Sequence, residues 1–266
     1  MNIDIFIPAR LNSKRLPKKH LEIINGTPMI ENLINRLSQT KKIRKIIVCT
    51  TNQDSDNELV QFLEKKDILY FRGSEKDILR RFARAAKKFK TDVIIDVEGD
   101  KIYTDPKFVD KIAVIMEGDE HYDFVIGNDS KTIFNPNNHF VHGIIPTAIR
   151  VSSLKNMIRT NLPKNIETGY KEIFVKNPNI KKKFLIMKSK LDIPQDLRLT
   201  VDYPNDIKFA RLVFEKLDNN FTHRNILSII KDNPRLLKII ERTNKIWERN
   251  YKLETKNFKY IIKSRL

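Results

Sequence analysis

The sequence contains a single cysteine, Cys49, and this excludes a disulfide bond within the chain. Its position in the apolar run KIIVCT is typical of a small buried side chain rather than a reactive thiol. No apolar run approaches the length needed to cross a bilayer, so we expect no membrane insertion. The N-terminal MNIDIFIPAR lacks the basic, apolar and small-residue order of a signal peptide. We therefore expect a soluble cytoplasmic protein whose fold begins at the first residue.

Several familiar ligand-binding patterns are also missing. The chain has neither G-x-x-x-x-G-K-S/T nor G-x-G-x-x-G, so assignment as a P-loop NTPase or a nicotinamide-dependent enzyme loses its main support. There is no internal repeat and no Gly/Ser-rich linker. Four histidines form no close metal-ligand pattern, and we interpret them as structural or solvated: His20, His121, His139 and His223.

Basic residues are abundant: 51 Lys and Arg stand against 33 Asp and Glu, for a formal charge of +18. Such a surplus is compatible with a nucleic acid, a membrane surface or an anionic small molecule as the partner. A chain of 266 residues is long enough for one well-buried core and a modest second lobe. Charge and length leave the partner open but favour one main domain with an appendage.

Strand-like and helical segments alternate through the first half of the chain. The apolar runs NIDIFI, IRKIIVCT, ILYF and DVIIDV predict strands, and the segments between them show helical spacing of apolar residues. The helix over residues 74–90 is expected to have Ser74 as its N-cap and Asp77 in its first turn. This alternation favours a Rossmann-like α/β fold, a mostly parallel sheet with helices on both faces. Further strands are expected at 122–127, 140–150 and 197–202, and helices at 151–160, 167–176, 204–217, 224–232 and 234–250.

Two aspartates follow apolar strands in the predicted sheet, and ligands bind sheets of this kind at the carboxyl ends of the strands. Asp100 comes shortly after DVIIDV, and Asp202 ends LRLTVD. Mg²⁺ prefers one or two carboxylates together with water and phosphate oxygens, so this pair suits a metal-dependent phosphoryl or nucleotidyl transfer. Gly99 would let a ligand approach the backbone closely. Asp202 could instead merely cap a helix, and Asp105 is expected to do only that.

The stretch IPARLNSKRLPKKHL crowds basic residues behind the first strand. A cationic loop that leads into a helix can hold a polyphosphate through backbone N–H groups and Arg or Lys side chains. On charge alone, a solvated basic turn is the slightly better interpretation. The two strand-end aspartates favour the polyphosphate, because metal carboxylates and a cationic loop fit together around one triphosphate.

Five segments make the chain similar to a known family. IPARLNSKRLPKKHL, NGTPMIENLINRL, FRGSEKDILRRF, EGDKIYTDP and RLTVDYPNDIKFARLVFEKL occur in that order. In order and spacing they resemble the cytidylyltransferases of the CMP-Kdo synthetase and spore-coat polysaccharide type. The resemblance covers residues 3 to 217 and implies the nucleotide-diphospho-sugar transferase variant of the Rossmann-like fold.

The resemblance implies a CTP-dependent nucleotidyltransferase that transfers CMP to an acidic sugar, Kdo or another 2-keto sugar acid, and releases pyrophosphate for polysaccharide synthesis. It implies Mg²⁺ as cofactor, held by Asp100 and Asp202. Catalytic stabilisation of pyrophosphate would come from Arg10, Arg15 and Lys19. The nucleotide would contact Pro8, Ala9, Arg10, Asn12, Ser13, Arg15 and Lys19, and, as weaker candidates for the base or ribose, Arg72, Gly73, Ser74 and Asp77.

The sequence departs from the family pattern beside the expected acceptor. Glu98 stands where relatives commonly have a basic or amide residue, and Lys101-Ile102-Tyr103 replaces the usual residues after the metal aspartate. Lys18 stands where the family usually has glycine, and Tyr203 replaces a small hydroxyl residue that would cap the next helix. These changes leave the acceptor sugar open. Weak candidates for a cation that binds an acidic acceptor are Lys131, His142, Arg150 and Lys171.

Residues 1–221 are expected to form the cytidylyltransferase domain, with a small α+β acceptor and dimerisation lobe at about 128–195. Residues 222–266 are expected to form a basic helical extension whose apolar positions, Leu236 and Ile240 among them, pack against the core or a partner subunit. We interpret Trp247 as an anchor in that contact, and a homodimer is the first expectation.

Two other functions remain open. The chain could transfer a nucleotide to a sugar phosphate or another small acceptor. More distantly, it could be a non-catalytic basic protein that binds nucleic acid or an anionic membrane. We expect no DNA or RNA partner, because the basic residues lack regularly interleaved aromatics and the two strand-end aspartates would repel phosphate without a metal.

Overall fold

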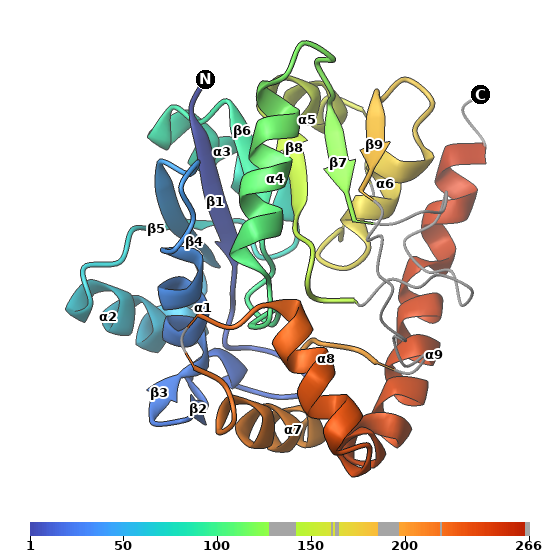
Figure 1. Ribbon diagram of the computed structural model, residues 1–266. Helices are drawn as coiled ribbons and strands as arrows, with labels where there is room; N and C mark the ends of the chain where they lie inside the picture. Colours follow the sequence, from blue (N-terminus) through green and yellow to red (C-terminus); the bar gives the residue numbers. More distant parts are fainter. Residues whose placement is uncertain (128–141, 161, 163–164, 186–196, 219, 264–266) are drawn as a thin grey trace.

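The computed structural model of the chain describes residues 1–127, 142–160, 162, 165–185, 197–218 and 220–263 (Figure 1). A seven-stranded sheet lies at its centre, in the order β5-β4-β1-β6-β8-β7-β9. Only β8 runs against its neighbours, so the sheet is mostly parallel, which confirms the predicted fold class. The strands are β1 (Ile3–Pro8), β4 (Lys45–Thr51), β5 (Tyr70–Gly73), β6 (Val93–Asp96), β7 (Phe124–Ile126), β8 (Thr147–Arg150) and β9 (Lys182–Phe184).

Helices cover both faces of the sheet. Alternate residues of a strand point to opposite faces, so each face presents apolar side chains against which helices pack. Ile5 of β1 belongs to one buried apolar cluster and Phe6 to the other. Figure 1 shows α4 in front of the sheet and α3 and α5 behind it. The first face packs against α1 (Met29–Leu37), α2 (Asn57–Lys65) and α4 (Pro106–Glu117), and the second against α3 (Ile78–Phe89), α5 (Val151–Ile158) and α6 (Tyr170–Lys176).

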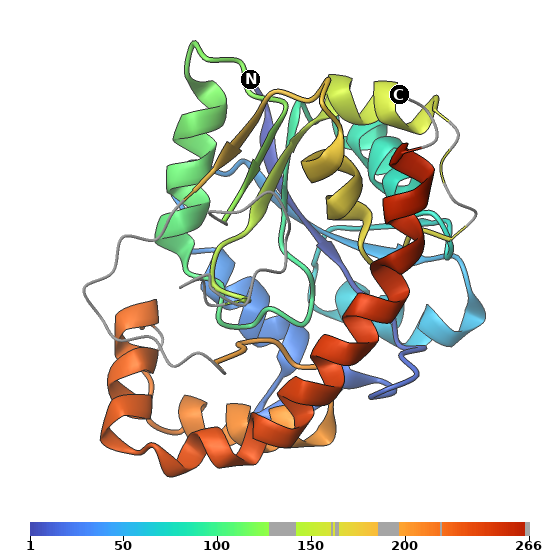
Figure 2. The same cartoon turned by 90° about the vertical axis from the view of Figure 1, so that its right-hand side faces the viewer.

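The C-terminal region is helical. α7 (Pro204–Phe214) and α8 (His223–Asp232) lead into α9 (Arg235–Lys263), which is longer than the predicted helix over residues 234–250. Figure 2 shows α9 crossing the molecule from α8 toward α6, and it packs against α6, α7 and α8. Leu236 and Ile240 are buried in the first apolar cluster, so this part of the helix packs against the core. Among the described residues, no helix combines the length and apolar character needed to span a membrane.

Some local predictions were wrong. The helix expected from residue 74 begins at Ile78 with Asp77 as its N-cap, and Ser74 Oγ accepts a hydrogen bond from the Asp77 backbone instead. The segment 197–202 forms only an isolated bridge between Arg198 and His142, rather than a strand. The hairpin of β2 (Ile23–Ile24) and β3 (Thr27–Pro28), strand β9 and the short 3₁₀ helix η1 (Lys19–Leu21) were not predicted. A second short 3₁₀ helix, η2 (Asp54–Asp56), begins the segment 54–66, which was expected to be helical.

Asp105 caps α4 as predicted, accepting a hydrogen bond from the Lys107 backbone N–H at 3.0 Å. It also accepts from the backbone N–H of His223 at 3.1 Å and contacts its ring. One carboxylate therefore serves the beginnings of both α4 and α8.

Phe82 connects strand β1 of the sheet to helix α6. Its ring packs edge-on against Phe6 at 5.6 Å and against Tyr170 at 6.3 Å between centroids. Because the side chain is fully buried, Phe82→Ala should lower the free energy of unfolding by about 3–5 kcal/mol, measured by urea denaturation. Val114→Ala, at a half-exposed position of α4, is the control and should change it by less than about 0.5 kcal/mol. Equal effects of the two changes would contradict the proposed core contact.

Candidate active site

Three chain segments meet at the carboxyl ends of β1 and β6. The loop after β1 carries Arg10 to Lys19, the loop after β6 carries Glu98 to Asp100, and Asp202 precedes α7. Backbone hydrogen bonds join them: Gly99 N–H donates to Pro8 C=O at 3.1 Å, and Val201 N–H donates to Asp100 C=O at 2.9 Å. The segments border a cavity of about 630 Å³.

Lys19 holds two of these segments together. Its Nζ lies 2.9 Å from Asp100 Oδ2, 3.1 Å from Asp202 Oδ1 and 2.9 Å from the Val201 carbonyl oxygen. Burial alone would lower the pKa of Lys19, but the two carboxylates outweigh burial and raise it. Lys19 is therefore a permanent cation that lets Asp100 and Asp202 lie close together.

Asp202 is held from several sides. Arg15 lies 2.8 Å from Oδ1, and Arg198 approaches Oδ2 at 3.5 Å while pairing with Asp206 at 2.6 Å. Burial would raise the pKa of Asp202, but Lys19, Arg15 and Arg198 outweigh it and hold the pKa well below its usual range. Asp202 is consequently ionised and fixed in orientation.

Asp100 is held less completely. Its Oδ1 is buried and has no hydrogen-bond partner among the described residues. Burial raises the pKa of Asp100, with Asp202 and Glu98 adding to the effect and Lys19 opposing it. A buried carboxylate oxygen without a donor fits a divalent cation. In the described part of the chain no group of three His, Cys, Asp or Glu side chains could hold a metal, so phosphate oxygens and water would have to complete the coordination of Mg²⁺.

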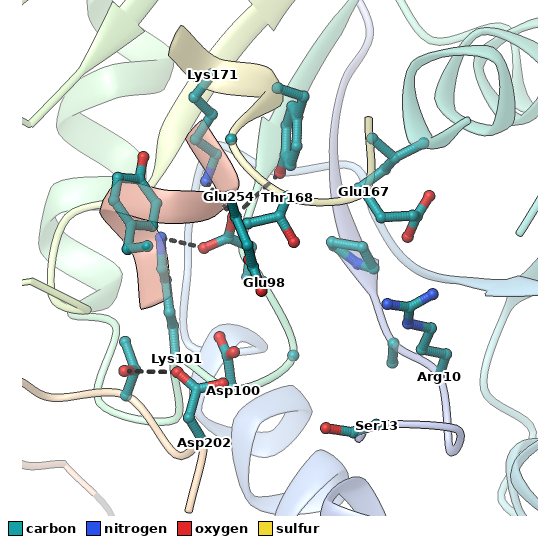
Figure 3. A pocket seen from close by; sticks show the side chains of 18 of the residues that line it. Arg10, Ser13, Glu98, Asp100, Lys101, Glu167, Thr168, Lys171, Asp202 and Glu254 are labelled. Atoms are coloured by element: carbon teal, nitrogen blue, oxygen red, sulfur yellow. Dashed lines mark hydrogen bonds and ion pairs between the residues drawn. The ribbon is translucent and has the colours of Figure 1, made fainter. Parts of the chain in front are cut away.

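A second charged cluster lies beside the first (Figure 3). Glu98 forms ion pairs with Lys101 and, at 3.1 Å, with Lys171, and Lys171 also lies 3.0 Å from Asp96. The Tyr170 hydroxyl donates to Asp96 at 2.5 Å. Burial would raise the pKa of Glu98, but the two lysines outweigh it and lower the pKa strongly. Burial raises the pKa of Asp96 even though Lys171 opposes it.

Three further cations line the cavity: Arg10, Lys14 and Lys76. Figure 3 shows Arg10 across the cavity from Asp100 and Asp202. None of the three cations forms an ion pair within the part of the chain that the structure describes. The cavity thus presents anchored carboxylates together with cations available to an anion, which is the charge arrangement of a site for a metal-bound polyphosphate.

Most sequence-predicted site residues line this cavity: Pro8, Ala9, Arg10, Asn12, Ser13, Arg15, Lys19, Asp100, His142, Lys171 and Asp202. Others lie outside it. Arg72 donates hydrogen bonds to the carbonyl oxygens of Thr51 and Gln53, and Arg150 donates to those of Tyr122 and Met116. Gly73, Ser74 and Asp77 do not line the cavity either, whereas their neighbours Glu75, Lys76 and Ile78 do. Lys131 lies outside the described residues.

Lys18 belongs to the same loop but points away from the cavity. Its φ of 57° lies in the left-handed region that glycine adopts most easily, which explains the glycine expected there from the family pattern. Its side chain pairs with Glu58 on α2 at 2.5 Å.

The C-terminal helix supplies one wall, which the sequence did not reveal. Trp247, Tyr251 and Glu254 of α9 line the cavity. The Trp247 ring stacks on Tyr251 at 5.3 Å between centroids and lies 5.5 Å from the Arg198 guanidinium. Because Asn244 accepts a hydrogen bond from Arg198 at 3.0 Å, α9 also fixes the arginine that holds Asp202.

Comparisons with known proteins identify the family and the fold. A family model described as Cytidylyltransferase matches residues 5–144. The spore coat polysaccharide biosynthesis protein SpsF of Bacillus subtilis is 26% identical over 246 residues, 88% of this chain and 96% of that protein. A 3-deoxy-manno-octulosonate cytidylyltransferase of Francisella philomiragia is 29% identical over 147 residues, 52% of this chain and 57% of that protein. A cytidylyltransferase structure from Leptospira borgpetersenii has the same fold, with a TM-score of 0.77 at 22% identity over 89% of this chain and 97% of that one.

Buried neutral histidines at the site predict a pH dependence of stability. Burial, with Lys19 adding to it, lowers the pKa of His20 to about 3. An unfolded histidine titrates near 6.5. Below that pH the unfolded state binds a proton that the folded state does not bind, so the free energy of unfolding falls as the pH falls. Urea denaturation between about pH 6.5 and 5 should show a loss of up to about 1.4 kcal/mol per pH unit from His20.

His20→Gln should flatten this slope. His121→Gln, at an exposed position, should leave the slope as in the unchanged protein. A slope that His20→Gln does not alter would contradict the assignment of His20 as a buried neutral group.

Proposed function

The chain belongs to the cytidylyltransferase family, and we propose that it transfers CMP from CTP to a hydroxyl group of an acidic sugar, with release of pyrophosphate, in polysaccharide synthesis. The observation that carries the proposal is the carboxylate pair Asp100 and Asp202, joined by Lys19, in a cavity that the available cations Arg10 and Lys14 also line. Such an arrangement suits an in-line displacement at the α-phosphorus, where catalysis consists mainly of positioning and charge neutralisation.

The loop after β1 would bind the triphosphate. Arg10, Lys14 and the Ser13 hydroxyl line the cavity and would contact the β- and γ-phosphates. As the bond to the α-phosphorus breaks, negative charge accumulates on pyrophosphate, and cations already in place stabilise it without reorganisation.

Asp100 and Asp202 would hold Mg²⁺, with the unpartnered Oδ1 of Asp100 as the first ligand. The bound ion would neutralise phosphate charge and polarise the α-phosphorus. Lys19 orients both carboxylates for this task, and together with Arg15 and Arg198 it keeps Asp202 ionised, so these three cations act as positioning residues.

The second cluster supports an acidic acceptor. Lys101 and Lys171 are cations that line the cavity beside Asp100. Glu98 partly neutralises both lysines, so an acceptor carboxylate would share them with Glu98. The Francisella relative is named for 3-deoxy-manno-octulosonate, a sugar acid, and this agrees with the proposal.

Loss of the metal-binding carboxylate should abolish most of the activity. We expect Asp100→Asn to lower kcat/KM for pyrophosphate release by roughly 100- to 1,000-fold, the effect of losing one preorganised electrostatic group. The assay uses CTP, a panel of sugar acids, neutral sugars and sugar phosphates, and Mg²⁺ or a chelator. Asp119→Asn, at an exposed position outside the cavity, is the matched control. Full activity of Asp100→Asn with Mg²⁺ would refute the metal assignment, and turnover only with sugar phosphates would refute the acceptor.

Removal of a lysine from the second cluster should weaken acceptor binding selectively. Lys171→Met should raise KM for a sugar acid by roughly 10-fold or more while KM for CTP changes little, because a charge-assisted contact is lost only at the acceptor. Lys155→Met, at an exposed position outside the cavity, is the control. If KM for a neutral sugar rose as much as KM for a sugar acid, Lys171 would not be recognising negative charge.

A further inference from the structure

Glu167 lies at the end of the cavity away from the carboxylate pair. Figure 3 shows it on the same side as Arg10, with Asp100 and Asp202 on the other side. It belongs to the segment that precedes α6, and the mechanism above gives it no task. Its side chain is only 9% exposed, so its carboxylate is held against the protein interior.

A buried arginine fixes one oxygen of this carboxylate. Arg81 of α3, whose side chain is 2% exposed, lies 3.1 Å from Glu167 Oε2. The same guanidinium donates to the Ser74 carbonyl oxygen at 2.6 Å, which ties it to the loop after β5. Gly73 leaves room for it, because a Cβ atom there would lie 2.9 Å from Arg81 Cγ. Arg81 therefore sets the orientation of Glu167.

The other oxygen has no such support. Glu167 Oε1 is buried and has no hydrogen-bond partner among the described residues. Burial raises the pKa of Glu167, although Arg81 opposes the shift. An unpaired buried carboxylate oxygen is costly, and at the wall of a cavity a ligand donor can remove that cost.

The rest of the site restricts what that donor is. In the proposed function, cationic groups of the loop after β1 bind the triphosphate, and Asp100 lies near the α-phosphorus. Lys101 and Lys171 bind the acceptor. The remaining lining of the cavity includes the apolar side chains of Pro8, Ala9 and Ile78. A flat, weakly polar base fits such a surface better than a polyol does.

We propose that Glu167 reads the nucleotide base: its Oε1 accepts a hydrogen bond from the exocyclic N4 amino group of cytosine, and Arg81 acts as its positioning residue. A carboxylate opposite cytosine N4 gains a hydrogen bond, as carboxylates do with cytosine in nucleic acids. Opposite uracil it would meet the O4 acceptor, and two acceptors repel. Glu167 would thus select CTP over UTP.

This assignment rests on the proposed function, so its test measures binding rather than turnover. Isothermal calorimetry with the full chain gives Kd values for CTP and UTP in the presence of Mg²⁺. The unchanged protein should prefer CTP. Glu167→Gln should reduce that preference by roughly 10- to 100-fold, the discrimination that one good base contact supplies, because an amide can offer either a donor or an acceptor.

Two further variants sharpen the test. Glu167→Asp keeps the negative charge beside Arg81 but withdraws the oxygen by one methylene group, so it should also lose preference while remaining folded. Glu75→Gln removes a carboxylate from the neighbouring wall and should keep the preference. Thermal melts of all variants exclude unfolding as the cause.

The possible results separate the two proposals. A CTP preference that survives in both Glu167→Gln and Glu167→Asp would overturn the base assignment alone. An equal loss of CTP and UTP affinity would indicate that Glu167 contacts the ribose or the phosphates, and this result would also overturn the base assignment. If the unchanged protein bound neither nucleotide, the proposed function would fall and the base assignment with it.

Discussion

The position of one buried ammonium group determines the rest of the site. Lys19 lies between Asp100 and Asp202, two carboxylates that would otherwise repel each other at this separation. It joins the loop after β1 to the loop after β6 and to the beginning of α7. Removing it would leave two buried charges without their shared partner, which is far more costly than losing a surface pair. The arginines around Asp202 and the wall formed by α9 are arranged about this contact.

The central layers of the fold were predictable because their residues carry periodic signals. Apolar runs that alternate with amphipathic helices indicate a doubly covered parallel sheet, and β1, β4, β5 and β6 follow it. The β2–β3 hairpin could also have been predicted, because the dipeptide Asn25-Gly26 is typical of a two-residue hairpin turn. Both residues have the positive φ that such a turn requires. The short β9, Lys182–Phe184, has a basic composition without strand periodicity, and only its pairing with β7 makes it a strand.

The site was predictable where chemistry is local in sequence. Arg10 to Lys19 form one loop, and Asp100 follows strand β6 as expected. Asp202 was also found from its apolar run, although that run forms no strand and Asp202 reaches the site just before α7. Glu167, Trp247 and Tyr251 come from segments with no recognisable motif, and only tertiary packing carries them to the cavity. Two of the departures from the family pattern compensate each other: the buried Lys101 has its ion pair with Glu98, and without that carboxylate its charge would be buried unpaired.

Trp247 is the only tryptophan in the chain, and it lies in the wall of the cavity between the Arg198 guanidinium and the Tyr251 ring. A cation close to an indole ring changes the energy of its excited state, and so does any charged molecule that enters the cavity. The tryptophan emission of the protein therefore originates at one known point of the site. Occupancy of the acceptor side can be followed optically without attaching a dye or altering a residue.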